Sequence, residues 1–381
     1  MTQLGEPAGA GAGSEPPKVW VGRVVEVTFK SRIAAVRSKA TIAGPHWKYG
    51  EDVLDKWDLA EPLKLPRGPY SKRAAVYLVK DAGGAREVEV KVEVKKCENV
   101  SGTGKLVGKL GALVVEGACP LAAGTHTVAA RITEPPEGIE HLRGSILWDM
   151  EAPGTAAWTM NQSFVELFFV LAAPIAAYTQ GVWVEALRLV CQRGAVRGVK
   201  PDEQALAVAK ITRYCHSDHG MRYDSQRGAS HYGVSSRGGV FRLADYLNQK
   251  SQRINCYDQA GAVQVLAGAV GVAVTWVFLN PYGFIKGTHL VGVGPCNSPF
   301  YESAGTAQSV DPKDPKRTAF GNHAFVELAK VHDACAGPHV GTESRVEYVA
   351  AAIDADPALY RGGRPGTAAD MVTFSGVTSV S

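Results

Sequence analysis

Hydrophobic and polar residues alternate strictly in one stretch of the first half of the chain. From Val88 to Val94 every second residue is valine, and the residues between them are Glu or Lys. A period of two with one apolar and one charged face predicts a β-strand that is buried on one side only. Further short segments of this character lie at 24–29, 74–79, 113–116 and 125–132. Because Gly, Pro and Asp separate the segments, the pattern predicts an all-β sandwich.

The pattern changes near residue 150. Glu151-Ala-Pro-Gly-Thr155 is a turn-forming sequence, so we expect a linker over residues 151–160. A chain of 381 residues is also long enough for two domains. We therefore expect a β-sandwich domain over residues 18–150 and a second domain over residues 161–381. Within the first, residues 124–131 resemble a late strand of an immunoglobulin-like fold.

The second domain combines helical and strand patterns. Val208, Ile211 and Cys215 share one face of an expected amphipathic helix. Residues 217–239 are dense in Gly, Ser, His and Arg and predict a long loop, of a kind that is often functional when ordered. A short helix is expected over residues 241–248. This mixture predicts a domain of α and β structure.

Targeting and membrane segments are not indicated. Residues 1–17 are rich in Gly, Ala, Glu and Pro and lack the basic and apolar regions of a signal peptide, so they predict a flexible tail. The longest apolar run, Phe164–Tyr178, contains Glu166 and Pro174 and is too short to cross a bilayer. It predicts a buried strand followed by a turn. We therefore expect a cytoplasmic protein without a membrane partner, and secretion by a non-classical route stays open.

Composition and charge give no indication of a nucleic-acid partner. With 45% hydrophobic and 20% charged residues, the chain has ordinary globular composition. Its 41 Lys and Arg against 37 Asp and Glu leave a net charge of only +4, and no basic run is long enough for a nucleic-acid patch. Seven cysteines without paired spacing favour free thiols in a reducing compartment over a disulfide scaffold.

One cysteine differs from the others in its context. Cys256 stands directly before small and apolar residues at helical spacing, Ala260, Val263, Ala267 and Val270. A helix that begins at this cysteine directs free backbone N–H groups and the positive end of its dipole at the sulfur, which stabilises a thiolate. The same N–H groups can receive an oxyanion that develops beside them. The sequence therefore predicts a nucleophilic thiol at a helix N-terminus.

A second signal follows downstream. Residues 320–328 read Phe-Gly-Asn-His-Ala-Phe-Val-Glu-Leu, residues 330–335 read Lys-Val-His-Asp-Ala-Cys, and together they predict two strands joined by a tight turn. A thiol nucleophile needs an imidazole as its ion-pair partner, and the imidazole needs an acceptor that fixes its tautomer. A hairpin can bring His323 and Asp333 side by side. Cys256, His323 and Asp333 are therefore the candidate triad.

This order, a Cys at a helix start followed by a His and an Asp on adjacent strands, resembles the transglutaminase-like superfamily. The matching residues are Asn255-Cys256-Tyr257, His323-Ala-Phe-Val-Glu327 and Val331-His-Asp-Ala334, and the resemblance covers about 163–340. It implies a papain-like α+β fold preceded by a β-sandwich. We expect that Cys256 attacks, that His323 acts as base and then acid, and that Asp333 orients the ring, without a cofactor.

The hairpin departs from that pattern in its length. His323 and Asp333 are only ten residues apart. A two-residue turn at Ala329-Lys330 would place His323 opposite Ala336. A turn centred nearer Leu328, or a bulge, is needed to bring the carboxylate to the ring.

Other roles stay open. Asn255, Gln259 and Gln252 are the candidate donors to an oxyanion. His289 is an alternative base, with Asp311 as its partner. A metal site is not expected, because the group Cys215, His216, His219 and His231 has no standard zinc spacing, and this group is better interpreted as part of a loop that shapes the cleft.

We expect a cysteine-dependent, amide-acting enzyme of the peptidase or amidase kind that forms an acyl-thioester on Cys256 with a protein or peptide substrate. Hydrolysis is preferred over cross-linking because the sequence indicates neither a calcium site nor a lysine-accepting channel. One alternative is a protein-glutamine deamidase or transglutaminase, such as a bacterial effector. Another is a non-catalytic interaction protein with a transglutaminase-like scaffold. The N-terminal β domain is the candidate surface for a protein partner.

Overall fold

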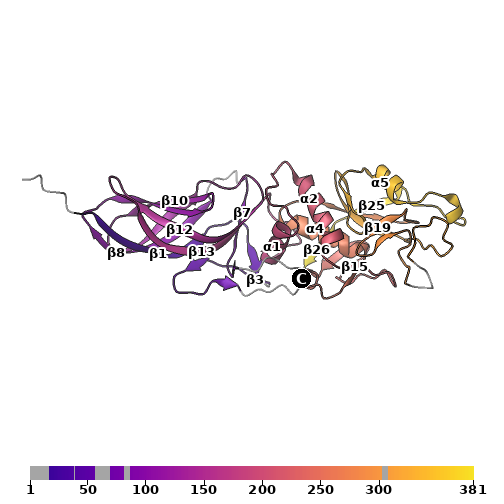
Figure 1. Ribbon diagram of the computed structural model, residues 1–381, viewed down its shortest axis with the longest axis horizontal. Helices are drawn as coiled ribbons and strands as arrows, with labels where there is room; N and C mark the ends of the chain where they lie inside the picture. Colours follow the sequence, from indigo (N-terminus) through magenta and orange to yellow (C-terminus); the bar gives the residue numbers. More distant parts are fainter. Residues whose placement is uncertain (1–16, 38, 56–68, 81–85, 303–307) are drawn as a thin grey trace, which may run out of the picture.

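The computed structural model describes residues 17–37, 39–55, 69–80, 86–302 and 308–381. The molecule is elongated, with long strands at one end and a mixture of helices and short strands at the other (Figure 1). It is therefore mostly β-structure with some helices. The expected tail at residues 1–17 lies outside the described residues except for Pro17.

Among the described residues, the N-terminal part forms one sheet of nine strands. Its members are β1 (Val19–Phe29), β4 (Trp47–Lys48), β7 (Ala75–Leu78), β8 (Glu87–Glu98), β9 (Thr103–Leu110), β10 (Leu113–Pro120), β11 (Gly124–Ile132), β12 (Glu140–Glu151) and β13 (Trp158–Val170). Their order across the sheet is β4-β1-β8-β11-β10-β9-β12-β13-β7. Neighbours are antiparallel except β13 and β7, which are parallel. The alternating valines of β8 are buried and the charged residues between them are more exposed, as the sequence pattern predicts.

The strand order differs from the expected pair of stacked immunoglobulin-like sheets. The nine strands form one continuous hydrogen-bonded sheet, which curls until β1 and β13 contact one another. The side chain of Asn161 on β13 bridges this contact. It accepts a hydrogen bond from the Val24 backbone N–H at 2.8 Å and donates one to the Val24 carbonyl at 3.0 Å. Alternation identifies which face of a strand is buried, but it does not determine the order of the strands.

Residues 151–160, the expected linker, instead connect two paired strands of this sheet. Met150 on β12 pairs with Trp158 on β13, so the turn-forming residues between them close a hairpin. Turn-forming residues mark hairpins as well as linkers, which explains the difference. The sheet continues to Val170, where β13 ends in a buried strand followed by a turn, as predicted for Phe164–Tyr178.

The C-terminal part is built around a sheet of five strands in the order β24-β22-β21-β18-β25. These are β18 (Thr275–Leu279), β21 (His323–Leu328), β22 (Lys330–Asp333), β24 (His339–Val340) and β25 (Met371–Phe374). The helices are α1 (Val184–Gln192), α2 (Gln204–Arg213), α3 (Leu243–Leu247), α4 (Cys256–Ala269) and α5 (Arg345–Ala352), with a π-helical turn at Tyr214–Asp218 and 3-10 turns at Pro357–Leu359 and Ala368–Asp370. Helix α4 packs against β21 and also contacts α1 and α2.

Smaller sheets complete the fold. Two of them have three strands: β2 (Ala35–Arg37) lies between β14 (Val182–Trp183) and β3 (Ala40–Thr41), and β19 (Thr288–Leu290) lies between β20 (Gly294–Cys296) and β23 (Ala336–Gly337). The others pair β15 (Arg222–Tyr223) with β17 (Arg253–Ile254), β16 (Gly238–Phe241) with β26 (Gly376–Val380), and β5 (Leu54–Asp55) with β6 (Tyr70–Ser71).

Helix α4 is buried on nearly every side, and its small residues explain how it fits. A Cβ atom added at Gly268 would lie 2.4 Å from the side chain of Ile175, and one added at Gly261 would lie 3.0 Å from Phe241. Protein interiors are packed too densely to accept such atoms without movement. The glycines therefore allow α4 to pass through the centre of the C-terminal part.

A buried ionic cluster joins the nine-stranded sheet to α1. Arg188 of α1 is fully buried and donates hydrogen bonds to Glu166 of β13 at 2.7 and 2.9 Å and to Asp55 at 3.0 Å. Its guanidinium also lies over the ring of Tyr70. Burial alone would raise the pKa of Glu166, but hydrogen bonds from His141 and Arg188 lower it to about 2.

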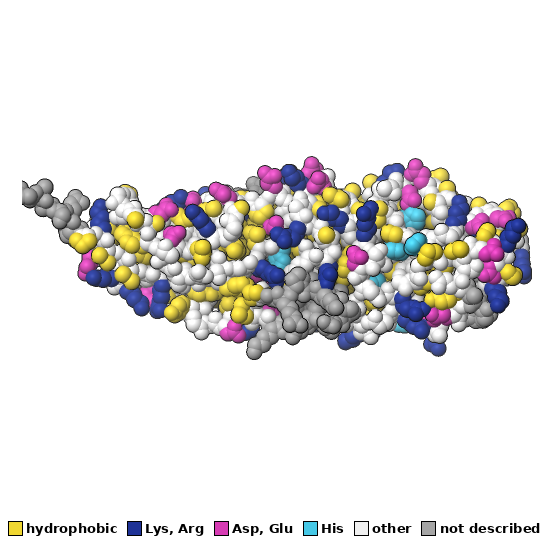
Figure 2. All heavy atoms as spheres, viewed as in Figure 1, with side chains coloured by type: hydrophobic (Ala, Val, Ile, Leu, Met, Phe, Trp, Pro, Cys, Tyr) yellow, Lys and Arg dark blue, Asp and Glu magenta, His cyan; other side chains and the backbone are white. Residues whose placement is uncertain are grey.

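The surface carries charges of both signs. Figure 2 shows Lys and Arg side chains interspersed with Asp and Glu over the visible face. Within the described part of the chain, none of the helices is long and apolar enough to cross a membrane.

Candidate active site

Cys256 is the first residue of α4, and a capping box fixes the start of the helix around it. The Asn255 side chain accepts a hydrogen bond from the Asp258 backbone N–H at 3.1 Å, and the Asp258 carboxylate accepts one from the Asn255 N–H at 3.2 Å. Reciprocal bonds of this kind satisfy N–H groups that a helix start leaves unpaired. The sulfur therefore stands where the N-terminal dipole of the helix favours negative charge.

Asp258 also holds the long loop against the helix start. Its carboxylate accepts hydrogen bonds from the Ser230 hydroxyl at 2.7 Å and from the backbone N–H groups of His231 and Tyr232 at 2.9 and 3.0 Å. Burial raises the pKa of Asp258 despite these bonds. The loop expected over residues 217–239 is thus ordered and lies next to Cys256.

A single residue forms the turn between β21 and β22. Leu328 pairs with Lys330, and Ala329 between them adopts a positive φ of 57°. A shift of one residue in register reverses which face a side chain occupies. A two-residue turn would have put His323 and Asp333 on opposite faces. The one-residue turn puts them on the same face, on a diagonal across the two strands.

His323 and Asp333 meet in the interior. Nε2 of the ring lies 2.7 Å from Oδ2 of the carboxylate, and their exposures are 0% and 1%. Oδ1 accepts a hydrogen bond from the Cys335 N–H at 2.8 Å, and Oδ2 also accepts one from the Tyr348 hydroxyl at 2.9 Å. Both oxygens therefore have hydrogen-bond partners that orient the carboxylate.

Charge and burial oppose one another at this pair. Burial alone would lower the pKa of His323, but the charges of Asp333 and Cys256 raise it to about 10. Burial would raise the pKa of Asp333, but the His323 charge lowers it. Both shifts favour an imidazolium beside a carboxylate, which is the state that an ion pair with a thiolate requires.

The second nitrogen of His323 is left for the thiol. Nδ1 is buried, and no described residue hydrogen-bonds to it in this structure. Cys256 nevertheless lies close enough to raise the pKa of the ring. The ring therefore has one nitrogen on the carboxylate and the other available to Cys256, which is exposed by only 4%.

The three candidate oxyanion donors are engaged elsewhere. Asn255 Nδ2 donates to the Gly228 carbonyl at 2.9 Å, and Gln252 Nε2 donates to the Gln249 carbonyl at 3.3 Å. Gln259 Nε2 donates to the Ala334 carbonyl at 3.1 Å. Backbone N–H groups at the start of α4, other than the Asp258 N–H that donates to Asn255, remain the candidates to stabilise an oxyanion.

The alternative base is not placed like His323. His289 is exposed on β19, where it pairs with Gly337. Asp311 is exposed, and its carboxylate accepts a hydrogen bond from the Lys313 N–H at 2.9 Å. Among the described hydrogen bonds and ion pairs, none joins His289 to Asp311.

The histidines of the long loop have separate partners. His216 Nδ1 lies 3.3 Å from the Ala334 carbonyl, His219 Nε2 lies 3.1 Å from Gln259 Nε2, and His231 Nε2 lies 3.1 Å from Asp224. In the described ranges, no three or more His, Cys, Asp or Glu side chains gather to hold a metal ion. All seven cysteines are described and free.

The aromatic surroundings of His323 were not predicted from the sequence. The rings of Tyr282 and Phe320 lie 4.9 and 5.1 Å from the imidazole. Tyr348 comes from α5, which starts at a capping box of Ser344 and Glu347. That box predicts a helix, but no pattern in the sequence indicates which residue of this helix points at Asp333.

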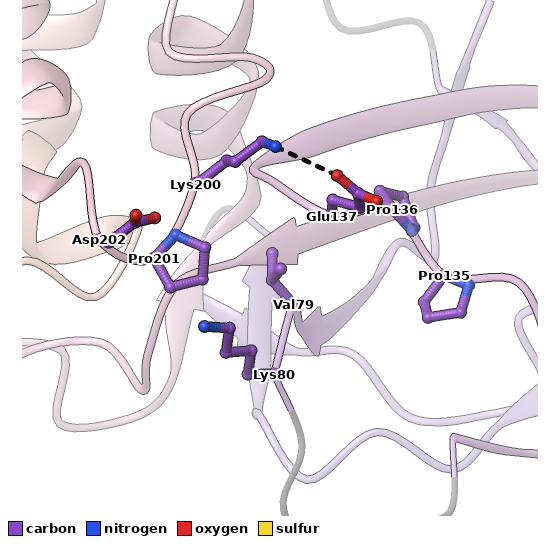
Figure 3. A pocket seen from close by; sticks show the side chains of 8 residues that line it. All are labelled: Val79, Lys80, Pro135, Pro136, Glu137, Lys200, Pro201 and Asp202. Atoms are coloured by element: carbon purple, nitrogen blue, oxygen red, sulfur yellow. Dashed lines mark hydrogen bonds and ion pairs between the residues drawn. The ribbon is translucent and has the colours of Figure 1, made fainter.

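The triad is covered in this structure. Three hollows of 340 to 400 Å³ lie elsewhere, and none of these three is lined by a triad residue. One of them lies between the nine-stranded sheet and the helical part, where Lys200 reaches across to Glu137 beside Val79 and Pro201 (Figure 3).

Among the comparisons with known proteins, only the comparison with solved structures finds a match. No protein-family model matches this sequence, and no curated protein sequence matches it. Eighteen chains of solved structures match it. One is red sea bream transglutaminase, with 10% identity and a TM-score of 0.32 over 70% of this chain and 49% of that chain. The protein thus spans about half the length of the transglutaminase to which it is similar.

Proposed function

We propose that this protein is a transglutaminase-like cysteine enzyme that acts on amides through an acyl-thioester on Cys256. The observation that carries the proposal is the placement of His323, with Nε2 on Asp333 at 2.7 Å and Nδ1 without a described partner beside Cys256. A buried imidazole held in this way is suited to a thiol–imidazole ion pair.

The reaction follows from these positions. The Cys256 thiolate attacks the amide carbonyl carbon and a C–S bond forms, while the backbone N–H groups at the start of α4 stabilise the oxyanion. His323 then donates its proton to the leaving nitrogen as the C–N bond breaks, which leaves a thioester. In hydrolysis, neutral His323 accepts a proton from water, the hydroxyl oxygen attacks the thioester carbon, and the C–S bond breaks. Asp333 keeps the ring oriented through both steps.

The test is a Cys256→Ala variant assayed on a mixture of peptides and proteins by mass spectrometry. We expect loss of all amide turnover, by about 1,000-fold or more, because the nucleophile is absent. A shortened substrate chain indicates a peptidase, a gain of about one dalton at glutamine indicates deamidation, and a cross-link indicates acyl transfer to an amine.

The matched control is Cys191→Ala, which removes a buried cysteine from helix α1. This variant should lose stability but keep its turnover, because Cys191 is not part of the site. Full amide turnover by Cys256→Ala would refute the proposal. The same experiment tests the alternative of a non-catalytic interaction protein. In that case wild type and both variants should all leave the amides unchanged.

A further inference from the structure

The carboxylate of Asp333 has one side-chain partner that the triad does not explain. The hydroxyl of Tyr348 donates a hydrogen bond to Oδ2 at 2.9 Å, and Oδ2 is the same oxygen that lies 2.7 Å from His323 Nε2. Tyr348 is completely buried. It belongs to helix α5, which follows the region 163–340 that carries the transglutaminase-like resemblance.

The direction of this hydrogen bond is fixed by its surroundings. Burial and the charge of Asp333 raise the pKa of Tyr348 well above its ordinary value, so the hydroxyl stays protonated and acts as a donor. A second hydroxyl, from Tyr282, lies 3.4 Å from that of Tyr348. Since the Tyr348 proton points at Asp333, the Tyr282 hydroxyl is the donor in this second contact.

The ring of Tyr348 is held as firmly as its hydroxyl. Phe325 of β21 packs on it with ring centroids 4.7 Å apart, and His339 packs edge-on at 4.8 Å. A ring fixed from two sides cannot rotate its hydroxyl away from the carboxylate without moving its neighbours. One of these two rings, Phe325, lies on the strand that also carries His323, so that strand helps to position Tyr348.

We propose that Tyr348 is a positioning residue that holds Oδ2 of Asp333 against the ring of His323. This inference rests on the proposed function. Tyr348 acts through Asp333 and does not touch the reacting atoms. Its hydrogen bond stabilises the ionised carboxylate and restricts its rotation, and both effects keep Nδ1 of His323 directed at Cys256. Tyr282 contributes less, because it reaches Asp333 only through Tyr348.

The test measures the reactivity of Cys256 and requires no substrate. Full-length wild type, Tyr348→Phe and Tyr282→Phe are treated with iodoacetamide across a range of about pH 5 to 11, which extends past the pKa of about 10 of His323. After trypsin digestion, the peptide 254–286 reports the alkylation of Cys256 alone, since it contains no other cysteine. The alkylation of Cys191 in the same samples provides the internal reference.

For Tyr348→Phe we expect alkylation of Cys256 to slow by about tenfold at neutral pH, as for the loss of one hydrogen bond to a charged group. The pH dependence of the rate should also differ from that of wild type, because a carboxylate with one fewer donor holds the imidazole less firmly in the ion pair. For Tyr282→Phe we expect a change below about threefold, because that hydroxyl makes only a long contact. A Tyr348→Phe profile identical to that of wild type would overturn the inference.

A double variant separates positioning from general loss of structure. If Tyr348 acts through Asp333, Tyr348→Phe should have no further effect on alkylation in an Asp333→Asn background. A full tenfold effect in that background would overturn the inference and assign Tyr348 a structural role only. If wild-type Cys256 reacts no faster than Cys191, the proposed function itself fails and this inference fails with it. Fast wild-type alkylation that Tyr348→Phe leaves unchanged refutes the inference alone.

Discussion

At the scale of single residues, His323 is the side chain on which the opposing forces are largest. Its ring is completely buried, which disfavours its charge, yet it lies between the Asp333 carboxylate and the Cys256 thiol. The charges prevail and raise the pKa of His323 to about 10. Protonation of the ring therefore stabilises the folded state, because the folded protein binds this proton more tightly than the unfolded chain does.

This shift makes stability depend on pH in a defined direction. The pKa of His323 is raised from 6.5 to about 10, so its contribution is fully present below about 6.5 and is lost as the pH rises through about 10. We expect the difference in free energy of unfolding between wild type and His323→Gln to decrease steadily between these two pH values. Urea denaturation at several pH values measures it.

The control for this measurement is His289→Gln, which changes an exposed histidine on β19. Its difference from wild type should stay small, because the side chain is exposed. A difference for His323→Gln that rises with pH would contradict the assigned charge state of the ring.

At the scale of elements, the one-residue turn at Ala329 decides whether His323 and Asp333 share a face. Ala329 is exposed and has a φ of 57°, a left-handed conformation that β-branched residues rarely adopt. We expect Ala329→Val to lower the free energy of unfolding by about 1–2 kcal/mol and to slow the alkylation of Cys256. Ala329→Gly should raise stability by up to about 1 kcal/mol. Chemical denaturation and alkylation rates provide both readouts.

Ala195 offers a matched comparison, because it is also exposed and has a φ of 52°. It follows α1 and lies outside the hairpin. Ala195→Val should cost similar stability and leave Cys256 reactivity unchanged. Equal effects of the two valine substitutions on alkylation would mean that the turn does not set the geometry of the site.

The elements were more predictable than their pairing. The strand over residues 87–95, the helix that begins at Cys256 and the hairpin after residue 320 all follow from periodicity and composition in the sequence, and the structure contains them. The register of the hairpin does not follow, because one residue in the turn reverses the face and Ala329 carries no turn signal of its own. Tyr348 could not be predicted either, since its contact with Asp333 depends on how α5 docks.

At the scale of the whole molecule, the buried cluster of Arg188, Glu166 and Asp55 connects the long sheet to the first helix of the C-terminal part. We expect Arg188→Ala to destabilise the protein by about 3–5 kcal/mol, because buried Glu166 loses its guanidinium partner and Asp55 keeps only Arg37. Thermal and urea unfolding of the nine-stranded sheet and of the C-terminal part should both show the lower free energy of unfolding. Arg197→Ala, which removes an exposed pair with Glu140, should cost less than about 1 kcal/mol. Similar losses for the two variants would refute a special role for the buried cluster.

The order of the strands in the long sheet could not be predicted from the sequence. Six of its strands, β1, β7, β8, β10, β11 and β13, overlap segments that the sequence pattern predicts, whereas β9 and β12 do not. The pairing of β9 with β12 and the parallel pairing of β7 with β13 join segments that are distant in the chain. The hairpin at residues 151–160 was mistaken for a linker for the same reason: a local turn signal does not show whether the flanking segments pair.

The position of α5 and β25 has a practical consequence for anyone who wishes to isolate a minimal working fragment. A polypeptide trimmed to residues 163–340 would retain Cys256, His323 and Asp333, yet it would lack the hydroxyl of Tyr348 and the strand that borders β18. It would also strip helix α4 of the backbone groups near residues 375–377 that bind Gln264. The fragment would contain the whole region that carries the resemblance, but the absence of activity in it would not show that the intact protein is inactive.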